Sequence, residues 1–275
     1  MATAPQASPE VLLRAVELRK SFGPRGLFSS SLKALDGVSL SIPRRSCTAL
    51  IGESGSGKST LAASLVRLED ADEGEVWFEG TNLSQLGGEA LRSRRAGLQL
   101  IFQDASAALN PRFTATELVE EPLVIQKIGT PTERHDRATE MLRTLGIPEE
   151  RHNSRPPEFS GGQRKRIALA RALVLRPRLL ILDEVFAGLD LLIANEILSQ
   201  LMELRSQQDL TLLFTSHDLS FLARRVDSIA VMQHGKIVEQ GSASDILSRP
   251  QHPYTKSLIS AHERLQRTTA KGAGQ

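Results

Sequence analysis

The sequence predicts an α/β fold whose central sheet is mostly parallel, and three observations lead to this prediction. Short apolar runs recur along the chain, helical segments separate them, and a glycine-rich turn joins one run to a helix. Apolar runs that are buried on both faces and separated by helices are typical of parallel sheets. With 275 residues, 40% of them hydrophobic, the chain is long enough to bury a sizeable core.

Alternation and apolar content predict the strands, and helical spacing predicts the segments between them. The predicted strands are Val11 to Leu18, Asp36 to Ile42, Thr48 to Ile51, Glu75 to Phe78, Leu98 to Phe102, Leu179 to Leu182 and Leu210 to Thr215. The predicted helices are Ser59 to Leu68, Ile167 to Leu175 and Leu192 to Gln207. The loop Gly23 to Ser31, rich in Gly, Pro and Ser, is expected to be a surface insertion.

The domain organisation follows from shifts in composition. Residues 1–10 are polar and rich in Ala, Pro and Ser, so we expect a disordered start, and residues 263–275 are expected to form a flexible tail. Residues 11–262 then form one folded domain. Within it, residues 105–172 have helical periodicity punctuated by prolines, which predicts a helical subdomain inserted into the core.

Charge and cysteine content exclude some classes of protein. The net charge is only +2 and no sustained basic block is present, which argues against nucleic-acid binding. Cys47 is the sole cysteine, so the chain cannot form an intramolecular disulfide, and we expect a buried structural thiol.

The sequence also bears on the cellular location. The start of the chain has neither the apolar core nor the basic residues of a secretory signal. A membrane helix needs about 20 apolar residues, and the most apolar region, Ile167 to Leu182, is interrupted by Arg171, Arg176, Pro177 and Arg178. We therefore expect a cytoplasmic protein whose membrane role, if any, depends on partner chains.

A phosphate-binding loop is predicted directly after the strand Thr48 to Ile51, where the pattern G-x-x-x-x-G-K-[ST] leads into a helix. The pattern covers Gly52, Glu53, Ser54, Gly55, Ser56, Gly57, Lys58, Ser59 and Thr60. Its glycines let backbone N–H groups converge on phosphates, and the helix adds the positive end of its dipole. Lys58 would bind the β- and γ-phosphates, Ser59 would ligate Mg²⁺, and Thr60 would help hold the α-phosphate.

Polar residues at the ends of other strands complete a predicted hydrolytic site. Asp183 and Glu184 follow an apolar strand, and ligands of parallel sheets bind at the carboxyl ends of strands. Asp183 can reach the metal, and Glu184 could polarise the attacking water. His217 and Gln103 also follow strands, and Gln103 is placed to contact the metal or that water. Taken singly, the acidic pair could be a strand-end cap, and a lone histidine is more often structural.

The string Phe159-Ser160-Gly161-Gly162-Gln163, between the phosphate loop and the acidic strand, resembles the signature motif of ABC transporter ATPases. The resemblance extends from about Leu12 to Ser260. It implies a P-loop NTPase (RecA-like) core with a mostly parallel sheet, an antiparallel β subdomain and an inserted α-helical subdomain. It also implies that ATP and Mg²⁺ are bound and that ATP is hydrolysed.

The same resemblance implies roles for individual residues. Phe22 would stack on adenine, Gln103 would belong to the Q-loop and Asp190 to the D-loop, and His217 would touch the γ-phosphate. The signature residues Ser160, Gly161, Gly162 and Gln163 would face ATP bound to an opposite subunit, with Ser160 and Gly162 in contact with it.

The partners implied by the family are a second ATPase subunit, identical or different, two transmembrane permease subunits, and, indirectly, an extracytoplasmic solute-binding protein. The chain would then lie on the inner face of the cell membrane, with no nucleic acid among its partners.

Two further patterns resemble the oligopeptide, dipeptide and nickel importer group. They are Phe102-Gln103-Asp104 with Leu109-Asn110-Pro111-Arg112, and His252-Pro253-Tyr254-Thr255 with Leu258. The chain departs from the family in three ways: Val185-Phe186-Ala187-Gly188 replaces Pro-Thr-Ser-Ala, Phe159 replaces leucine, and the cysteine cluster of some members is absent.

Several alternatives stay open on the sequence alone. The chain could serve an exporter or a lipid or lipoprotein extractor, or a nucleic-acid-linked ABC ATPase that moves no solute. It could also pair with a different ATPase subunit. The solute itself is undetermined, because its pocket would belong to the binding protein and the permeases.

Overall fold

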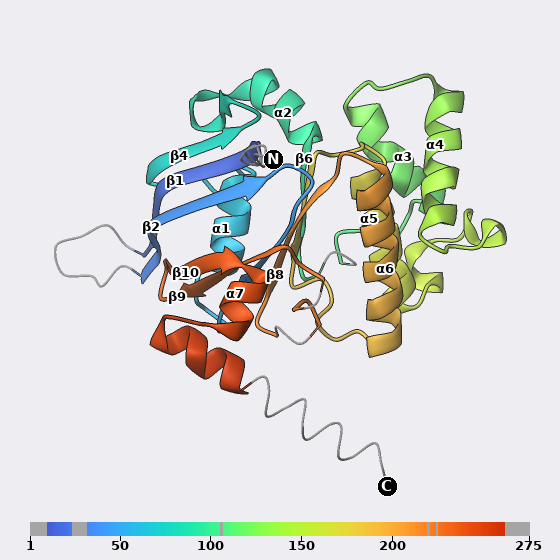
Figure 1. Ribbon diagram of the computed structural model, residues 1–275. Helices are drawn as coiled ribbons and strands as arrows, with labels where there is room; N and C mark the ends of the chain where they lie inside the picture. Colours follow the sequence, from blue (N-terminus) through green and yellow to red (C-terminus); the bar gives the residue numbers. More distant parts are fainter. Residues whose placement is uncertain (1–9, 24–31, 105–106, 219–220, 224, 262–275) are drawn as a thin grey trace, which may run out of the picture.

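The computed structural model describes residues 10–23, 32–104, 107–218, 221–223 and 225–261. Figure 1 shows their arrangement as two sheets on one side and a group of helices on the other. Nearly all of the predicted disordered start, the loop after Phe22 and the C-terminal tail lie outside the described residues.

The central sheet is six-stranded and mostly parallel, as the sequence predicts, with the order β10-β9-β3-β8-β7-β6. Its strands are β3 (Cys47–Ile51), β6 (Leu98–Ile101), β7 (Leu179–Asp183), β8 (Thr211–Ser216), β9 (Ser228–Gln233) and β10 (Lys236–Ser242). Every pair is parallel except β9 with β10. All residues of β3 and β7 are buried, because helices or the second sheet cover both faces. Cys47 is fully buried there, and burial raises the pKa of its thiol to about 12.

A second, four-stranded sheet is antiparallel throughout and has the order β2-β1-β4-β5. It consists of β1 (Val11–Phe22), β2 (Leu32–Pro43), β4 (Glu73–Phe78) and β5 (Thr81–Asn82). Helix α1 (Lys58–Leu65) packs between the two sheets (Figure 1), with Leu61 and Leu65 in one apolar cluster with residues of both. This confirms the antiparallel β subdomain.

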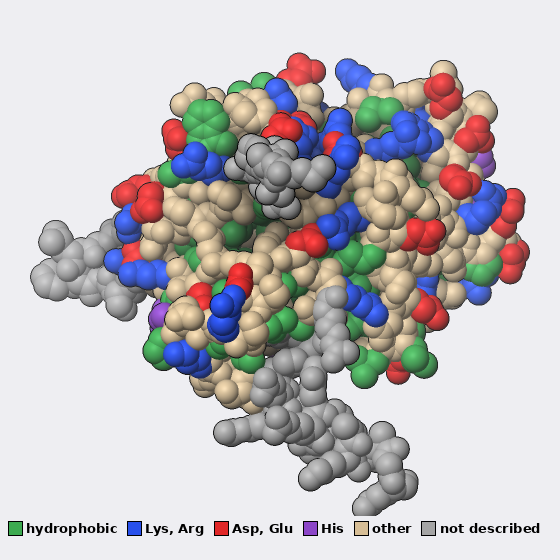
Figure 2. Space-filling model, viewed as in Figure 1, with side chains coloured by type: hydrophobic (Ala, Val, Ile, Leu, Met, Phe, Trp, Pro, Cys, Tyr) green, Lys and Arg blue, Asp and Glu red, His purple; other side chains and the backbone are tan. Residues whose placement is uncertain are grey.

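The helices on the far side of the central sheet are α3 (Ala115–Ile125), α4 (Pro131–Thr144), α5 (Gly161–Leu173) and α6 (Leu191–Gln207). The first three occupy the predicted helical span, and each begins with a capping box. Their apolar faces share a second cluster with β3, β7 and β8. Around them, Figure 2 shows acidic and basic side chains interspersed on the surface in view. No helix within the described ranges is long and apolar enough to cross a membrane.

Several elements differ from the prediction. Helix α1 ends at Leu65 and not at Leu68, since Arg67 has φ 58, a left-handed conformation that a helix cannot continue. Helix α5 begins at Gly161, well before Ile167. The elements predicted from the sequence do not include α2 (Gly88–Ala96), β9, β10, α7 (Ala243–Ser248) or the helix over residues 253–261.

Candidate functional site

The candidate site lies where strands β3, β7 and β8 end together. Parallel pairing places Ile51 of β3 beside Ser216 of β8, and Thr215 beside Asp183 of β7. The phosphate loop follows Ile51, Glu184 follows Asp183, and His217 follows Ser216. Sheet register therefore brings segments that are far apart in the sequence to one edge.

The phosphate loop has little space for side chains at two of its glycines. A Cβ atom on Gly52 would lie 2.2 Å from the carbonyl oxygen of Met232, because the loop leaves β3 directly against β9. Gly57 precedes α1 with φ 108, and a Cβ there would lie 2.4 Å from the carbonyl oxygen of Ala34. Only glycine satisfies both conditions, so the pattern of glycines is a requirement of the fold here.

The side chain of Lys58 is buried beneath this loop. Its Nζ donates to the carbonyl oxygens of Gly52 and Glu53, both at 2.8 Å, and lies 3.6 Å from the Glu184 carboxylate. Burial lowers the pKa of Lys58, while Glu184 and Asp183 oppose that shift. A partly desolvated ammonium group that faces a glycine turn attracts a phosphate more strongly than one in water does.

The acidic pair has two different environments. Asp183 is 3% exposed and accepts a hydrogen bond from the Thr215 hydroxyl. Glu184 has φ 49, and its N–H donates to the backbone oxygen and the hydroxyl oxygen of Thr215, both at 3.2 Å. The Glu184 carboxylate lies 3.3 Å from Nδ1 of His217, whose side chain is 57% exposed. Asp183 is thus fixed in the interior, while Glu184 faces the open side.

The donor set fits a magnesium nucleotide. No group of three acidic, cysteine or histidine side chains that could hold a metal occurs in the described ranges. Mg²⁺ commonly takes one or two protein oxygens and completes its shell with phosphates and water. The hydroxyl of Ser59, at the exposed start of α1, and the carboxylate of Asp183 can supply such oxygens. The space beside Gly55 is open, which leaves room for phosphates.

The remaining predicted residues lie on other elements. Phe22 ends β1 and is 42% exposed, with Lys20 Nζ 5.4 Å from its ring centre, and Gln103 follows β6. Ser160 and Gln163 cap α5 through hydrogen bonds to each other. Asp190 caps α6, and its neighbours Gly188, Leu189 and Leu191 line a cavity of about 350 Å³ with Glu184 and His217.

Two residues that hold the site together were missed by the sequence analysis. Thr215 contacts both acidic residues, and its place before His217 at a strand end was a signal that could have indicated this. Lys165 of α5 donates to the backbone oxygens of Val185 and Ala187, at 2.7 and 2.8 Å. Nothing in the sequence pattern distinguishes Lys165 from the basic residues beside it.

A central parallel strand that leads through a glycine turn into a helix, with an acidic strand end alongside, defines a P-loop nucleotide hydrolase. The ABC transporter family model matches residues 35–187, more than half of the chain, and a model for the oligopeptide/dipeptide transporter C-terminal region matches residues 238–274. The chain belongs to the ATP-binding subunits of ABC transporters, and it is an ATPase.

Curated relatives resemble the chain over most of its length. The dipeptide transport ATP-binding protein DppF of Haemophilus influenzae is 40% identical over 92% of this chain and 79% of its own length. The oligopeptide transport ATP-binding protein OppF of Bacillus subtilis is 42% identical over 92% of this chain and 82% of its own.

Solved structures share the fold. The dimeric cassette MJ0796 in a post-hydrolysis state, bound to ADP and Pi, has a TM-score of 0.76 and 28% identity, covering 84% of this chain and 99% of that one. The ADP conformation of the cassette MJ1267 has a TM-score of 0.74 and 29% identity, covering 90% and 98%.

Proposed function

We propose that the chain drives peptide import as the ATPase subunit of a membrane complex. The match of residues 238–274 to the oligopeptide/dipeptide transporter C-terminal region carries this proposal, together with relatives named for dipeptide and oligopeptide transport. Export, lipid extraction and nucleic-acid-linked roles find no support among these relatives. Nickel or another small solute is the competing cargo within the same group.

Nucleotide binding would use the phosphate loop and its surroundings. Lys58 would exchange the backbone oxygens of Gly52 and Glu53 for the β- and γ-phosphates, which are stronger acceptors for an ammonium group. Phe22 offers an exposed ring for adenine, and Thr60 would hold the α-phosphate. Mg²⁺, bound by Ser59 and Asp183 with Gln103 close to it, would neutralise charge on the phosphates.

Hydrolysis would depend on the Glu184 carboxylate. It is the carboxylate that reaches both Lys58 and His217, and unlike Asp183 it is not held in the interior by Thr215. Glu184 would accept a proton from the attacking water, and His217 would contact the γ-phosphate and hold Glu184 in place. This division of roles follows from the two environments of the acidic pair.

A second ATPase subunit would complete each site. The start of α5, with Ser160, Gly161 and Gly162, is a helix N-terminus with no large side chain, which suits a phosphate from the opposite subunit. The partner is either a second copy or a related chain. Two such subunits would close on ATP and reopen after hydrolysis, a rigid-body movement biased by the nucleotide.

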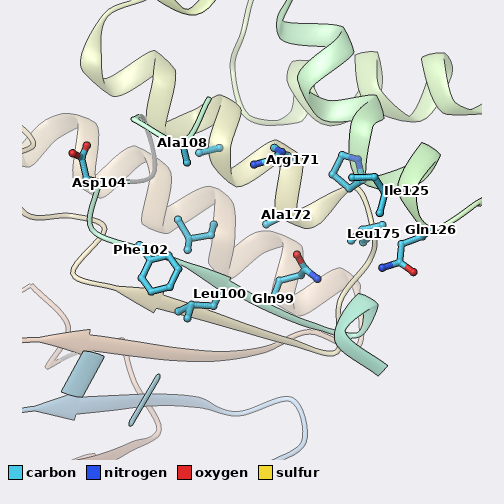
Figure 3. A pocket seen from close by; sticks show the side chains of 13 residues that line it. Gln99, Leu100, Phe102, Asp104, Ala108, Ile125, Gln126, Arg171, Ala172 and Leu175 are labelled. Atoms are coloured by element: carbon cyan, nitrogen blue, oxygen red, sulfur yellow. The ribbon is translucent and has the colours of Figure 1, made fainter. Parts of the chain in front are cut away.

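The permease would dock on the groove in Figure 3, a cavity of about 450 Å³ between β6 and helices α3 and α5. Phe102 and Ile125 are 46% and 45% exposed there, and Arg171 also lines the groove. The groove begins next to Gln103 and is walled by the helical side of the molecule. A permease segment bound in this groove would move with the helices when they shift relative to the nucleotide site. The chain would then lie on the inner face of the membrane.

Uptake assays test this function. The full chain is placed in vesicles together with peptide-importer permeases and a binding protein, and uptake of a labelled dipeptide and of Ni²⁺ is measured. We expect ATP-dependent dipeptide uptake that Lys58→Ala abolishes and Lys256→Ala, on an exposed lysine, leaves unchanged. Uptake of Ni²⁺ without dipeptide uptake would refute the peptide assignment. Failure of the chain to bind magnesium ATP would refute its role as the ATPase that drives import.

A further inference from the structure

The helix over residues 253–261 contacts the phosphate loop. The phenolic oxygen of Tyr254 accepts a hydrogen bond from the backbone N–H of Glu53 at 2.9 Å, although the two residues are 201 positions apart in the sequence. Tyr254 lies outside the nucleotide-binding pattern, which ends at Thr60.

The hydrogen bond fixes the peptide unit formed by the Gly52 carbonyl and the Glu53 N–H, and the oxygen of that unit accepts from Lys58 Nζ at 2.8 Å. The carbonyl oxygen of Glu53 accepts from Lys58 Nζ at 2.8 Å and from the N–H of Ser56 at 3.2 Å. Tyr254 holds the N–H side of the same residue. Glu53 lies on the surface, so without the phenol this N–H would turn toward water and the first turn of the loop would lose one of its restraints.

Tyr254 is itself held firmly. Residues 253–261 form a helix, and the Glu239 carboxylate of β10 accepts hydrogen bonds from the N–H groups of Gln251 and His252 at 2.7 and 2.9 Å, just before it. Thr255 is fully buried and Ile259 is 6% exposed, while Tyr254 packs against the apolar cluster on the helical side of the central sheet. The phenol therefore reaches the loop from an anchored helix. Burial raises the pKa of Tyr254, so its oxygen stays a neutral acceptor near pH 7.

We propose that Tyr254 is a positioning residue for ATP binding, which holds the first turn of the phosphate loop in its phosphate-binding conformation through the Glu53 N–H. The proposal rests on the phosphate loop being the nucleotide site. It gives the C-terminal region of this chain a direct effect on nucleotide affinity. Because the restraint acts before the chemical step, it stabilises bound ATP and the transition state equally.

The test compares Tyr254→Phe, which removes one oxygen and keeps the ring, with Lys256→Ala on the exposed side of the same helix. For the full chain, losing one such hydrogen bond should weaken magnesium ATP binding about threefold to tenfold. The KM for ATP should rise by the same factor, with kcat changed by less than about twofold. Lys256→Ala should match the wild type in each measurement.

Hydrogen exchange separates positioning from a general loosening. In Tyr254→Phe, amide exchange should speed up over residues 52–56 and stay as in the wild type over residues 253–261. Wild-type affinity in Tyr254→Phe would overturn the proposal, and so would faster exchange along the whole helix. Lys58→Ala serves as the reference. If Lys58→Ala binds ATP as the wild type does, the nucleotide site itself is misassigned. If Lys58→Ala loses ATP binding while Tyr254→Phe keeps it, only the role of Tyr254 is refuted.

Discussion

The backbone of Glu184 is in a left-handed conformation that non-glycine residues rarely adopt. Its φ is 49, and a conformation of this kind costs on the order of 1 kcal/mol or more. Thr215 offsets part of this cost by accepting from the Glu184 N–H with two oxygens. The turn directs the carboxylate away from β7 to Lys58 and His217, so the strain is located at the residue that we assign to catalysis.

Replacing the Glu184 carboxylate by an amide should separate binding from hydrolysis. Glu184→Gln keeps the size of the side chain and removes the proton acceptor, so ATP hydrolysis should fall by roughly 10² to 10⁴. Magnesium ATP should still bind, which would trap a closed dimer. Phosphate release and gel filtration with ATP measure the two effects. Glu149→Gln, on a side chain that is 79% exposed, is the control. Normal turnover in Glu184→Gln would show that Glu184 is not the general base.

The sequence predicts those residues of the candidate site that lie at strand ends or after the glycine turn, and it misses those whose contacts depend on tertiary structure. Lys58, Asp183, Glu184 and His217 could be found because apolar strands and a glycine turn mark where they lie. The hydrogen bond between Tyr254 and Glu53 joins residues 201 positions apart, and no local pattern encodes such a pairing. Residue type alone could not tell that Tyr254 faces the loop.

At the level of elements, strands with fully buried residues were predicted and marginal elements were missed. Strands β3 and β7 are continuous apolar runs. Strand β10 has no buried residue and carries Lys, Glu and Gly, which are depleted in strands, and α2 buries only Leu91. Strand β9 is different, because its apolar run over Ile229 to Met232 is a usable strand signal in the sequence.

Helix α5 is tied to the segment after Glu184 through Lys165. Its ammonium group donates to the backbone oxygens of Val185 and Ala187, in the stretch where this chain departs from its family. Burial lowers the pKa of Lys165, while Asp104 opposes that shift. The lysine thereby links α5 to the segment that leads to Asp190.

Breaking this link should destabilise the protein. Lys165→Met keeps the aliphatic stem and leaves two partly buried carbonyl oxygens without their donor, so the free energy of unfolding should fall by about 1 to 2 kcal/mol. Urea unfolding measures the change. Lys256→Met, on an exposed lysine, should leave the unfolding curve in place. Equal stability of Lys165→Met and the wild type would show that Lys165 does not hold this segment.

At the scale of the whole molecule, the proposed dimer would use two separate surfaces of each subunit. The phosphate loop and Glu184 lie at the carboxyl ends of the central strands, while Ser160 and Gly161 begin a helix of the helical group. The similar cassette MJ0796 is dimeric in a post-hydrolysis state bound to ADP and Pi. In a dimer with two-fold symmetry, the phosphate loop of each subunit would face the start of α5 in its partner.

Mixing two inactive variants tests this arrangement. Gly161→Glu should fold, because a Cβ there meets no atom within 4 Å and an acidic residue is favourable in the first turn of α5. Its carboxylate should nevertheless repel a phosphate from the partner, while Lys58→Ala disables the phosphate loop. Each variant alone should be inactive, whereas freely exchanged mixed dimers contain one intact site, which restores roughly a quarter of wild-type activity. Gly161→Ala, which adds no charge, should remain active. If the mixture stays as inactive as its components while Gly161→Ala hydrolyses ATP, the two surfaces do not meet across a dimer of this chain.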